Sequence, residues 1–228
     1  MVDFSFAHRP EGFDNHIEKS IRGYTHLIQD VVSFSRYFIE DNTEVVDVGC
    51  STGKMTKALI DYNIDHCKDA HYVGIEIADG FVKDLKKRGK ELDYYPNVEF
   101  VIEDAREYEF MNCSLVTSIF TLQFMPKTDR KSLLENIYNG LNDGGAYIFA
   151  EKTICENAFM QDMITFNFYD YKRQSFSATD IMDKEQELRH MMKPNTWKEI
   201  EEMLHSSGFD KVQPFWRNHA FVGAIAVK

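Results

Sequence analysis

The chain has 228 residues, a length that one large α/β domain fills. Hydrophobic residues make up 43% and charged residues 28%, close to globular averages, which excludes a disordered chain. The net charge of −11 disfavours broad contact with a nucleic-acid backbone or an anionic membrane surface, so we expect no stable DNA binding and no membrane partner.

The first 40 residues predict an N-terminal helical region. From Asp14 onward, apolar residues recur three and four positions apart, which is typical of amphipathic helices. Gly23 interrupts this pattern, so we expect two helices or a kink there. The run Glu44–Gly49 is short, apolar and closed by glycine, which predicts a buried strand, and a helix follows from about Gly53.

Strand-like and helix-like patterns then alternate. The predicted strands cover 71–76, 98–102, 114–120 and 146–150, and the predicted helices cover about 79–91 and about 128–142, the second ended by Gly144-Gly145. Residues 152–207 form a helical addition of three helices, and two closing strands follow near 211–215 and 220–227. The alternation favours a single domain with a seven-stranded, mostly parallel sheet flanked by helices.

The sharpest motif is Asp47-Val48-Gly49-Cys50-Ser51-Thr52-Gly53, at the first strand–helix turn. Glycine there lets the backbone approach a ligand, and a helix N-terminus favours anionic groups. Ser51 stands where a Gly-x-Gly-x-x-Gly fingerprint has its middle glycine, which disfavours a nicotinamide dehydrogenase. The spacing Asp-x-Gly-x-x-x-Gly resembles motif I of class I S-adenosylmethionine (SAM) methyltransferases. The resemblance implies their Rossmann-like fold and SAM as the cofactor.

Two acidic positions fit such a ligand. Glu76, at the end of the second strand, can accept hydrogen bonds from both ribose hydroxyls; its alternative roles are a helix cap or a solvated acid. Asp104 follows the third strand, where methyltransferases often bind the adenine amino group. After the fourth strand, Ile119–Pro126 lacks the Asp/Asn-Pro-Pro-Tyr/Phe motif of DNA amino-methyltransferases, and no Pro-Cys nucleophile is present. Both absences argue against DNA base methylation.

Several stretches, in order from about residue 13 to the C-terminus, resemble the carboxy-S-adenosyl-L-methionine synthase family. They are Phe13-Asp14, Ser20-Ile21-Arg22-Gly23-Tyr24, Gly49-Cys50-Ser51, Phe120-Thr121-Leu122-Gln123-Phe124, the segment 137–146, Glu151-Lys152, Asp170-Tyr171-Lys172-Arg173 and Gly208-Phe209. The resemblance implies synthesis of carboxy-SAM from SAM and prephenate, for wobble-uridine modification in tRNA. It also implies a homodimer.

The family's ligand positions carry over unevenly. Ile77 and Ile119 stand where the family usually has asparagine, and Glu76 replaces an aspartate. With these departures, the expected cofactor-binding residues are Tyr24, Gly49, Cys50, Ser51, Gly53, Glu76, Ile77, Asp104, Ala105 and Ile119.

One departure bears on mechanism. The family's last helix carries an arginine that grips the added carboxylate, and Met203 stands at that position. Methionine donates no hydrogen bond, and losing one to a charged group costs about 1.5–3 kcal/mol. Met203 equally fits a core stripe with Trp197, Ile200 and Leu204. Cations that can substitute from elsewhere are Arg189, Lys193 and Arg217. The substitution, together with the acidic charge, predicts a site short of fixed cations, suited to SAM rather than carboxy-SAM.

On the first added helix, Tyr169, Lys172 and Arg173 are candidates for an acceptor pocket; the alternatives are a dimer face or a solvated surface. The histidines show no metal-ligand spacing, and the four cysteines form no Cys-x-x-Cys pair, so we expect no metal and a reduced, cytoplasmic protein.

The favoured hypothesis is a SAM-dependent methyltransferase with a small-molecule acceptor. Its catalytic residues are not identifiable from sequence, because a sulfonium-bound methyl group is already activated and positioning supplies most of the rate. Tyr24, Phe120 and Phe124 are expected to face the sulfonium with their π-surfaces. The alternatives are a carboxy-SAM synthase, or a non-catalytic SAM-binding module. A tRNA partner stays open through the family resemblance, although the charge does not favour it.

Overall fold

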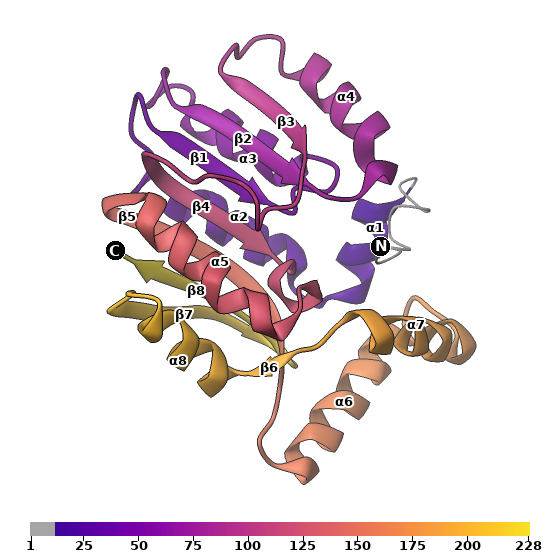
Figure 1. Cartoon of the computed structure of the whole chain (residues 1–228). Coiled ribbons are helices and arrows are strands. Elements are labelled where there is room, and N and C mark those ends of the chain that lie inside the picture. Colours follow the sequence, from indigo (N-terminus) through magenta and orange to yellow (C-terminus); the bar gives the residue numbers. More distant parts are fainter. Residues whose placement is uncertain (1–11) are drawn as a thin grey trace.

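The computed structural model describes residues 12–228, so the first eleven residues of the predicted N-terminal region lie outside the described part. Two helices open the chain, α1 (Phe13–Ser20) and α2 (Tyr24–Ser35). Gly23 separates them at φ 78°, a left-handed conformation that glycine adopts without strain. The predicted break is thus confirmed, and it lets α1 lie beyond the carboxyl ends of the strands while α2 packs against one face of the sheet (Figure 1).

A central sheet follows the order β3-β2-β1-β4-β5-β8-β7. Five parallel strands form most of it: β1 (Glu44–Val48), β2 (His71–Glu76), β3 (Val98–Ile102), β4 (Cys113–Ile119) and β5 (Leu141–Ile154). The hairpin of β7 (Lys211–Asn218) and β8 (Phe221–Val227) closes the sheet, with β8 antiparallel to β5. The fold is the expected Rossmann-like α/β architecture.

Successive strand residues alternate between the two faces of the sheet. Val45 packs into one core cluster with Leu27 of α2 and Leu59 of α3 (Lys54–Asn63). Val46 packs into the other, against Leu134 of α5 (Lys127–Gly140) and the last long helix, α8 (Trp197–Ser206). Both faces are therefore covered, which explains why these strands read as solidly apolar.

The remaining elements surround the carboxyl ends of the parallel strands. A 3₁₀ turn (Asp79–Phe81) leads into α4 (Val82–Glu91), and another 3₁₀ turn (Leu122–Phe124) follows β4. Helices α6 (Ala158–Lys172) and α7 (Ala178–Met191) project from the sheet on the same side as α1 (Figure 1). No helix among residues 12–228 is long and apolar enough to cross a membrane.

One local expectation was wrong, and one short strand was not expected. Gly144-Gly145 does not end the preceding helix, because α5 stops at Gly140 and Leu141 is already extended (φ −69°, ψ 141°). Gly144 instead takes φ 83° inside β5, near the point where the register against β4 shifts. The sequence also gave no sign of β6 (Asn195–Thr196), a two-residue strand that pairs with the end of β5.

Candidate functional site

A cavity of about 1150 Å³ opens at the carboxyl ends of β1, β2 and β4. In the strand order the chain leaves β1 on one side for β2 and on the other for β4, and such a switch point is where open α/β sheets bind ligands. Helices α1, α6 and α7 contribute the outer wall. The volume exceeds the 300–1,000 Å³ typical of a single small-ligand pocket, which leaves room for a second molecule.

The turn after β1 contains a glycine position that has no room for a side chain. Gly49 has φ 74°, and a Cβ atom there would meet the Thr121 side chain at 2.3 Å. The backbone N–H groups of Gly49 and Cys50 donate to the Ile75 carbonyl oxygen, at 2.8 and 3.0 Å, which ties this turn to β2. Gly53 caps α3 and packs against Phe100, but it is not part of the cavity wall.

Beneath the turn, Asp47 is fully buried. Its carboxylate accepts hydrogen bonds from the hydroxyls of Thr56 on α3, at 2.8 Å, and Thr117 on β4, at 2.9 Å. Burial raises the pKa of Asp47, and these hydroxyls oppose that effect. The first residue of the motif therefore joins β1, α3 and β4 and itself lines the cavity.

Glu76 connects the first two strand ends. One carboxylate oxygen accepts from the Ser51 N–H and the other from the Ala78 N–H, each at 2.9 Å. Only 6% of the residue is exposed, and burial raises its pKa. Each oxygen keeps lone pairs that can accept from a ligand hydroxyl. The loop-capping role and the ribose-binding role are thus compatible in one side chain.

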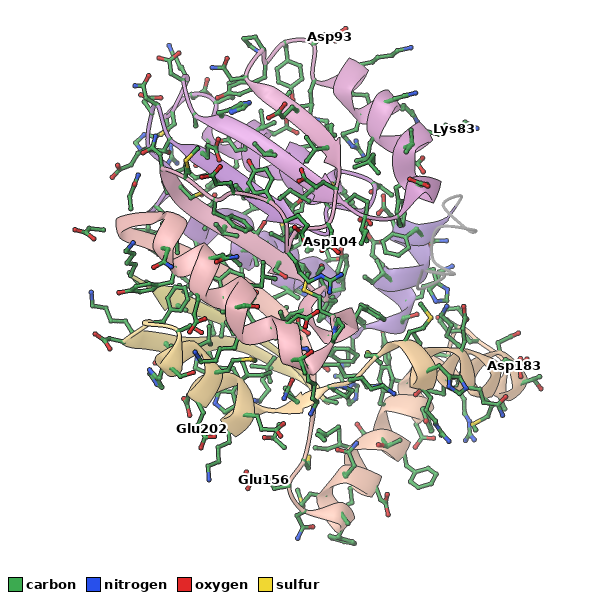
Figure 2. The ribbon with its side chains drawn as sticks, viewed as in Figure 1. Lys83, Asp93, Asp104, Glu156, Asp183 and Glu202 are labelled. Carbon is green, nitrogen blue, oxygen red and sulfur yellow. The ribbon has the colours of Figure 1, made fainter. Side chains whose placement is uncertain are left out.

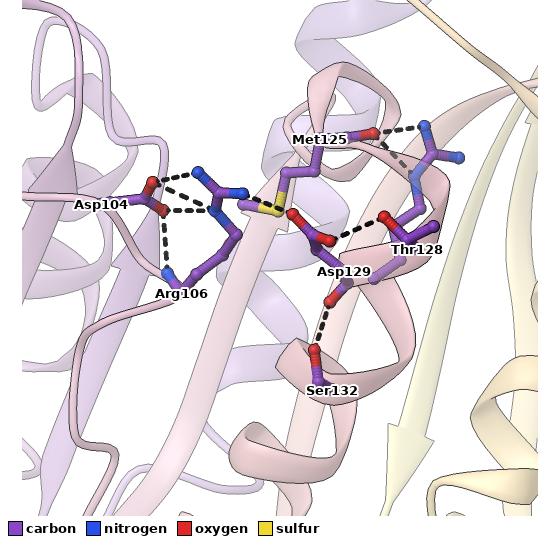
Figure 3. A network of polar contacts seen from close by, with 7 residues as sticks. Asp104, Arg106, Met125, Thr128, Asp129 and Ser132 are labelled. Atoms are coloured by element: carbon purple, nitrogen blue, oxygen red, sulfur yellow. Dashed lines mark hydrogen bonds and ion pairs between the residues drawn. The ribbon is translucent and has the colours of Figure 1, made fainter.

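Asp104 also lies on the cavity wall, but a neighbouring cation engages it. Its Oδ1 accepts from the backbone N–H and Nε of Arg106, each at 3.0 Å, and this guanidinium holds the pKa of Asp104 below its usual value. Arg106 also reaches Asp129 at the start of α5 (Figure 3). Figure 2 shows Asp104 near the middle of the molecule, whereas labelled residues such as Lys83 and Asp183 lie at its outside. A ligand amino group must share the Asp104 carboxylate with Arg106.

Aromatic and apolar residues form the centre of the wall. Tyr24, the first residue of α2, is largely buried, which raises the pKa of its hydroxyl, and its ring centroid lies 6.3 Å from that of Phe120. Phe120 adopts φ 60°, an uncommon conformation for a bulky residue. Cys50, Ile77, Ala105 and Ile119 line the cavity as well.

Sequence reasoning missed the group that fixes the loop after β4. The buried Glu151 carboxylate accepts from the backbone N–H groups of Leu122 and Gln123, at 3.0 and 2.8 Å. Burial raises the pKa of Glu151 to about 8, against the attraction of Arg130. Arg130 in turn donates to the carbonyl oxygens of Gln123 and Met125. Figure 3 labels Met125, whose carbonyl oxygen is one of these acceptors.

Of the three candidates on α6, the structure places one in the cavity wall and two outside it. Lys172 is 5% exposed and lines the cavity. Arg173 is exposed and pairs with Asp170 at 3.5 Å, and Tyr169 packs against the first core cluster, so neither is part of the wall.

The expectation of a site short of fixed cations is wrong. Lys152, Lys172 and Lys184 all line the cavity, at its β5, α6 and α7 side. Met203 packs on the second core cluster and is outside the wall, which agrees with its core-stripe interpretation. Within residues 12–228, the substitutes considered from sequence, Arg189, Lys193 and Arg217, are also outside it. No cluster of three or more His, Cys, Asp or Glu in that range could hold a metal ion.

The chain is similar in sequence and in fold to several known proteins. Residues 45–145 match the family described as "Methyltransferase domain". The chain is 33% identical to a carboxy-S-adenosyl-L-methionine synthase of Staphylococcus epidermidis, over 95% of this chain and 92% of that protein. It is 32% identical to the enzyme of that name from Shewanella baltica, over 100% of this chain and 94% of that protein. A crystal structure of a putative O-methyltransferase from Nostoc punctiforme matches with a TM-score of 0.66 at 15% identity, covering 98% of this chain and 60% of that one.

Proposed function

From the premise that the chain belongs to the carboxy-S-adenosyl-L-methionine synthase family of SAM-dependent methyltransferases, we propose that it transfers a carboxyl group from prephenate to the methyl carbon of SAM. The chain is a SAM-dependent enzyme. The observation that carries the proposal is the extent of the match. It spans 95% of the chain and so includes the α6–α7 addition, which lies outside the matched methyltransferase domain.

The overall reaction balances without an oxidant or reductant. The bond from the prephenate ring to its carboxyl group breaks, and a carbon–carbon bond forms between that carboxyl group and the methyl carbon. The ring hydroxyl leaves with one proton from the methyl group as water, and the aromatic product is phenylpyruvate. Bound SAM supplies a methyl group that its sulfonium activates.

The residues present fit SAM. The Gly49 turn allows close backbone approach, the Glu76 carboxylate offers acceptors to ribose hydroxyls, and Asp104 offers an acceptor on the adenine side. The π-faces of Tyr24 and Phe120 suit a sulfonium cation. Since Glu151 fixes the loop after β4, the cavity wall facing the reacting groups is held in one geometry, as positioning catalysis requires.

The charge distribution in the cavity supports an anionic second substrate. Glu76 and Asp104 lie at the ends of β2 and β3, whereas Lys152 lies at the end of β5, beyond β1 and β4 in the sheet. The cavity is therefore acidic at one end and basic at the other. A ligand with ribose at the acidic end leaves the basic end for a dianion such as prephenate.

Methyl transfer to a small-molecule acceptor is the second candidate, and the match of residues 45–145 to a methyltransferase domain favours it. Homodimer formation, a cytoplasmic location and a contribution to tRNA wobble-uridine modification accompany the first candidate, since the family resemblance implies them.

The test is mass spectrometry of the nucleoside products formed from SAM and prephenate. We expect a product about 44 mass units above SAM, the mass of one CO2, together with an equal amount of phenylpyruvate. Omitting prephenate should abolish both. Absence of the heavier product, with methylation of an added acceptor, would establish methyl transfer instead. Absence of any product despite SAM binding would indicate a non-catalytic module.

A further inference from the structure

Two lysines and one glutamate converge at the β5 end of the cavity. Lys152 Nζ lies 3.8 Å from Glu185 Oε2, and Lys172 Nζ lies 3.9 Å from Glu185 Oε1. Their side chains are 16%, 6% and 15% exposed for Lys152, Lys172 and Glu185. Three consecutive elements of the chain, β5, α6 and α7, thus bring three charges together on one largely buried stretch of the cavity wall.

The pairing within this cluster is incomplete. Both distances exceed the range of a hydrogen bond, so neither ammonium group donates to the carboxylate that it faces. Each ammonium carries three N–H donors, and no hydrogen bond from either side chain forms within residues 12–228. Two positive charges share one negative charge, which leaves a net charge of about +1 in a site where a buried charge is costly unless paired.

The surroundings favour an anion with an apolar body. The Phe168 ring lies under both ammonium groups, 5.7 Å from Lys152 Nζ and 5.3 Å from Lys172 Nζ. Leu188 and Met192 of the α7 region line the cavity beside them. An apolar ring bearing a carboxylate would bury its ring on these side chains and meet both ammonium groups with its charge.

Hydrogen bonds of the main chain hold the backbone of Lys152 in position. Its N–H donates to Gln123 Oε1 at 2.7 Å, and the Gln123 N–H donates to Glu151 at 2.8 Å. Lys184 of α7, which also lines the cavity, pairs with Glu187 at 2.8 Å. The backbone of one of the two lysines that share Glu185 is thus held in place, and a fixed backbone favours a selective site.

We propose that Lys152 and Lys172, spaced by Glu185, form a carboxylate-binding subsite at the β5 end of the cavity. This proposal rests on the proposed function only where it names the molecule that carries the carboxylate. One source is the carboxylate that the second substrate retains in phenylpyruvate. The other is the carboxylate added to SAM, for which Met203 stands in place of the family's arginine.

The test is calorimetric titration of the full chain with SAM, carboxy-SAM and phenylpyruvate. Lys172→Met keeps the length of the side chain and removes its charge, and we expect binding of one carboxylate ligand to weaken by tenfold or more while SAM affinity stays within twofold. Loss confined to phenylpyruvate identifies the second substrate as the source, and loss confined to carboxy-SAM identifies the added carboxylate. Lys152→Met provides the same measurement if Lys172→Met melts below the assay temperature.

Two control variants separate ligand binding from a structural role. Glu185→Gln removes the competing negative charge, so we expect it to bind the carboxylate ligand at least as tightly as the original chain; a structural ion pair predicts weaker binding and a lower melting temperature. Arg173→Met, on the same helix but outside the wall, should bind all three ligands unchanged. Equal affinities of Lys172→Met and the original chain for both carboxylate ligands, or equal losses with Arg173→Met, would overturn the proposal.

The proposed function and the subsite fail independently. If no product about 44 mass units heavier forms while phenylpyruvate binding still depends on Lys172, the function is refuted and the subsite stands. If the product forms while binding of both carboxylate ligands ignores the two lysines, the function stands and the subsite is refuted.

Discussion

Replacing Glu76 with glutamine tests how the chain holds SAM. The carboxylate divides its two oxygens between the N–H groups of Ser51 and Ala78, each at 2.9 Å. Glutamine keeps one oxygen and places an NH₂ group against one of those N–H donors, so one loop hydrogen bond is lost. The ribose loses the charged acceptor at the same time.

The magnitude follows from the hydrogen bonds at stake. A hydrogen bond to a charged group contributes about 1.5–3 kcal/mol, and each 1.4 kcal/mol changes an affinity tenfold. Glu76→Gln removes the charge and one acceptor, so we expect SAM binding to weaken about 10- to 150-fold. Glu76→Ala removes both acceptors and is expected to weaken it further.

The assay is isothermal titration of SAM into each variant, with a melting curve of each free protein. Glu99→Gln is the matched control, because Glu99 lies on the neighbouring strand β3 with its side chain 52% exposed. Its SAM affinity should equal that of the original chain. A folded Glu76→Ala variant that binds SAM with unchanged affinity would refute the assignment of Glu76 to the ribose.

Three further outcomes are expected. Gly49→Ala places a Cβ atom 2.3 Å from Thr121 Oγ1 at φ 74°, so urea unfolding should show a loss of about 2 kcal/mol or more; an equally stable variant would contradict the geometry. SAM titrations from pH 8 to pH 5 should show weakening on acidification, because burial raises the pKa of Glu76 and protonation removes an acceptor, whereas Glu76→Gln should show a flat profile. Burial raises the pKa of Glu151 to about 8, so the native state binds this proton more tightly than the unfolded chain does. The free energy of unfolding should therefore fall as pH rises from the ordinary carboxyl range to about 8. In urea melts at pH 5 and pH 8, Glu151→Gln should lose this pH dependence.

The parts of the fold that sequence predicts are those where local pattern and final environment agree. Val45 and Val46 face opposite clusters, and both are apolar because helices cover both faces of the sheet. The turn at Gly49 was predictable because close backbone approach leaves no room for a side chain, and a motif records that constraint. The predicted helix end at Gly144 was wrong, because a glycine in the left-handed conformation is found at helix ends and at irregularities within strands alike.

The charged part of the site was less predictable, because burial of a long charged side chain depends on contacts that are remote in sequence. Arg130 belongs to a helix whose pattern reads as a solvated face, yet it is 2% exposed. Glu151 accepts from the backbone of residues 28 and 29 positions earlier. Neither arrangement leaves a periodic signal. The pairing of Arg106 with Asp104 could not be predicted either, because it depends on the turn after β3, which directs the guanidinium back onto that carboxylate.

The acidic charge and Met203 suggested a cavity without cations, and the structure shows why the inference failed. A net charge of −11 sums over the whole chain, whereas a ligand responds to the few groups within a screening length of about 10 Å. Met203 is on α8, which packs on the face of the sheet and contributes to its core. The lysines at the β5 end of the cavity come instead from the end of β5 and from the inserted helices α6 and α7, and Lys54 and Arg106 also line the cavity. A missing arginine on one element therefore does not determine the charge of a cavity that other elements build, and we expect selectivity for an anionic ligand to depend on Lys152 and Lys172.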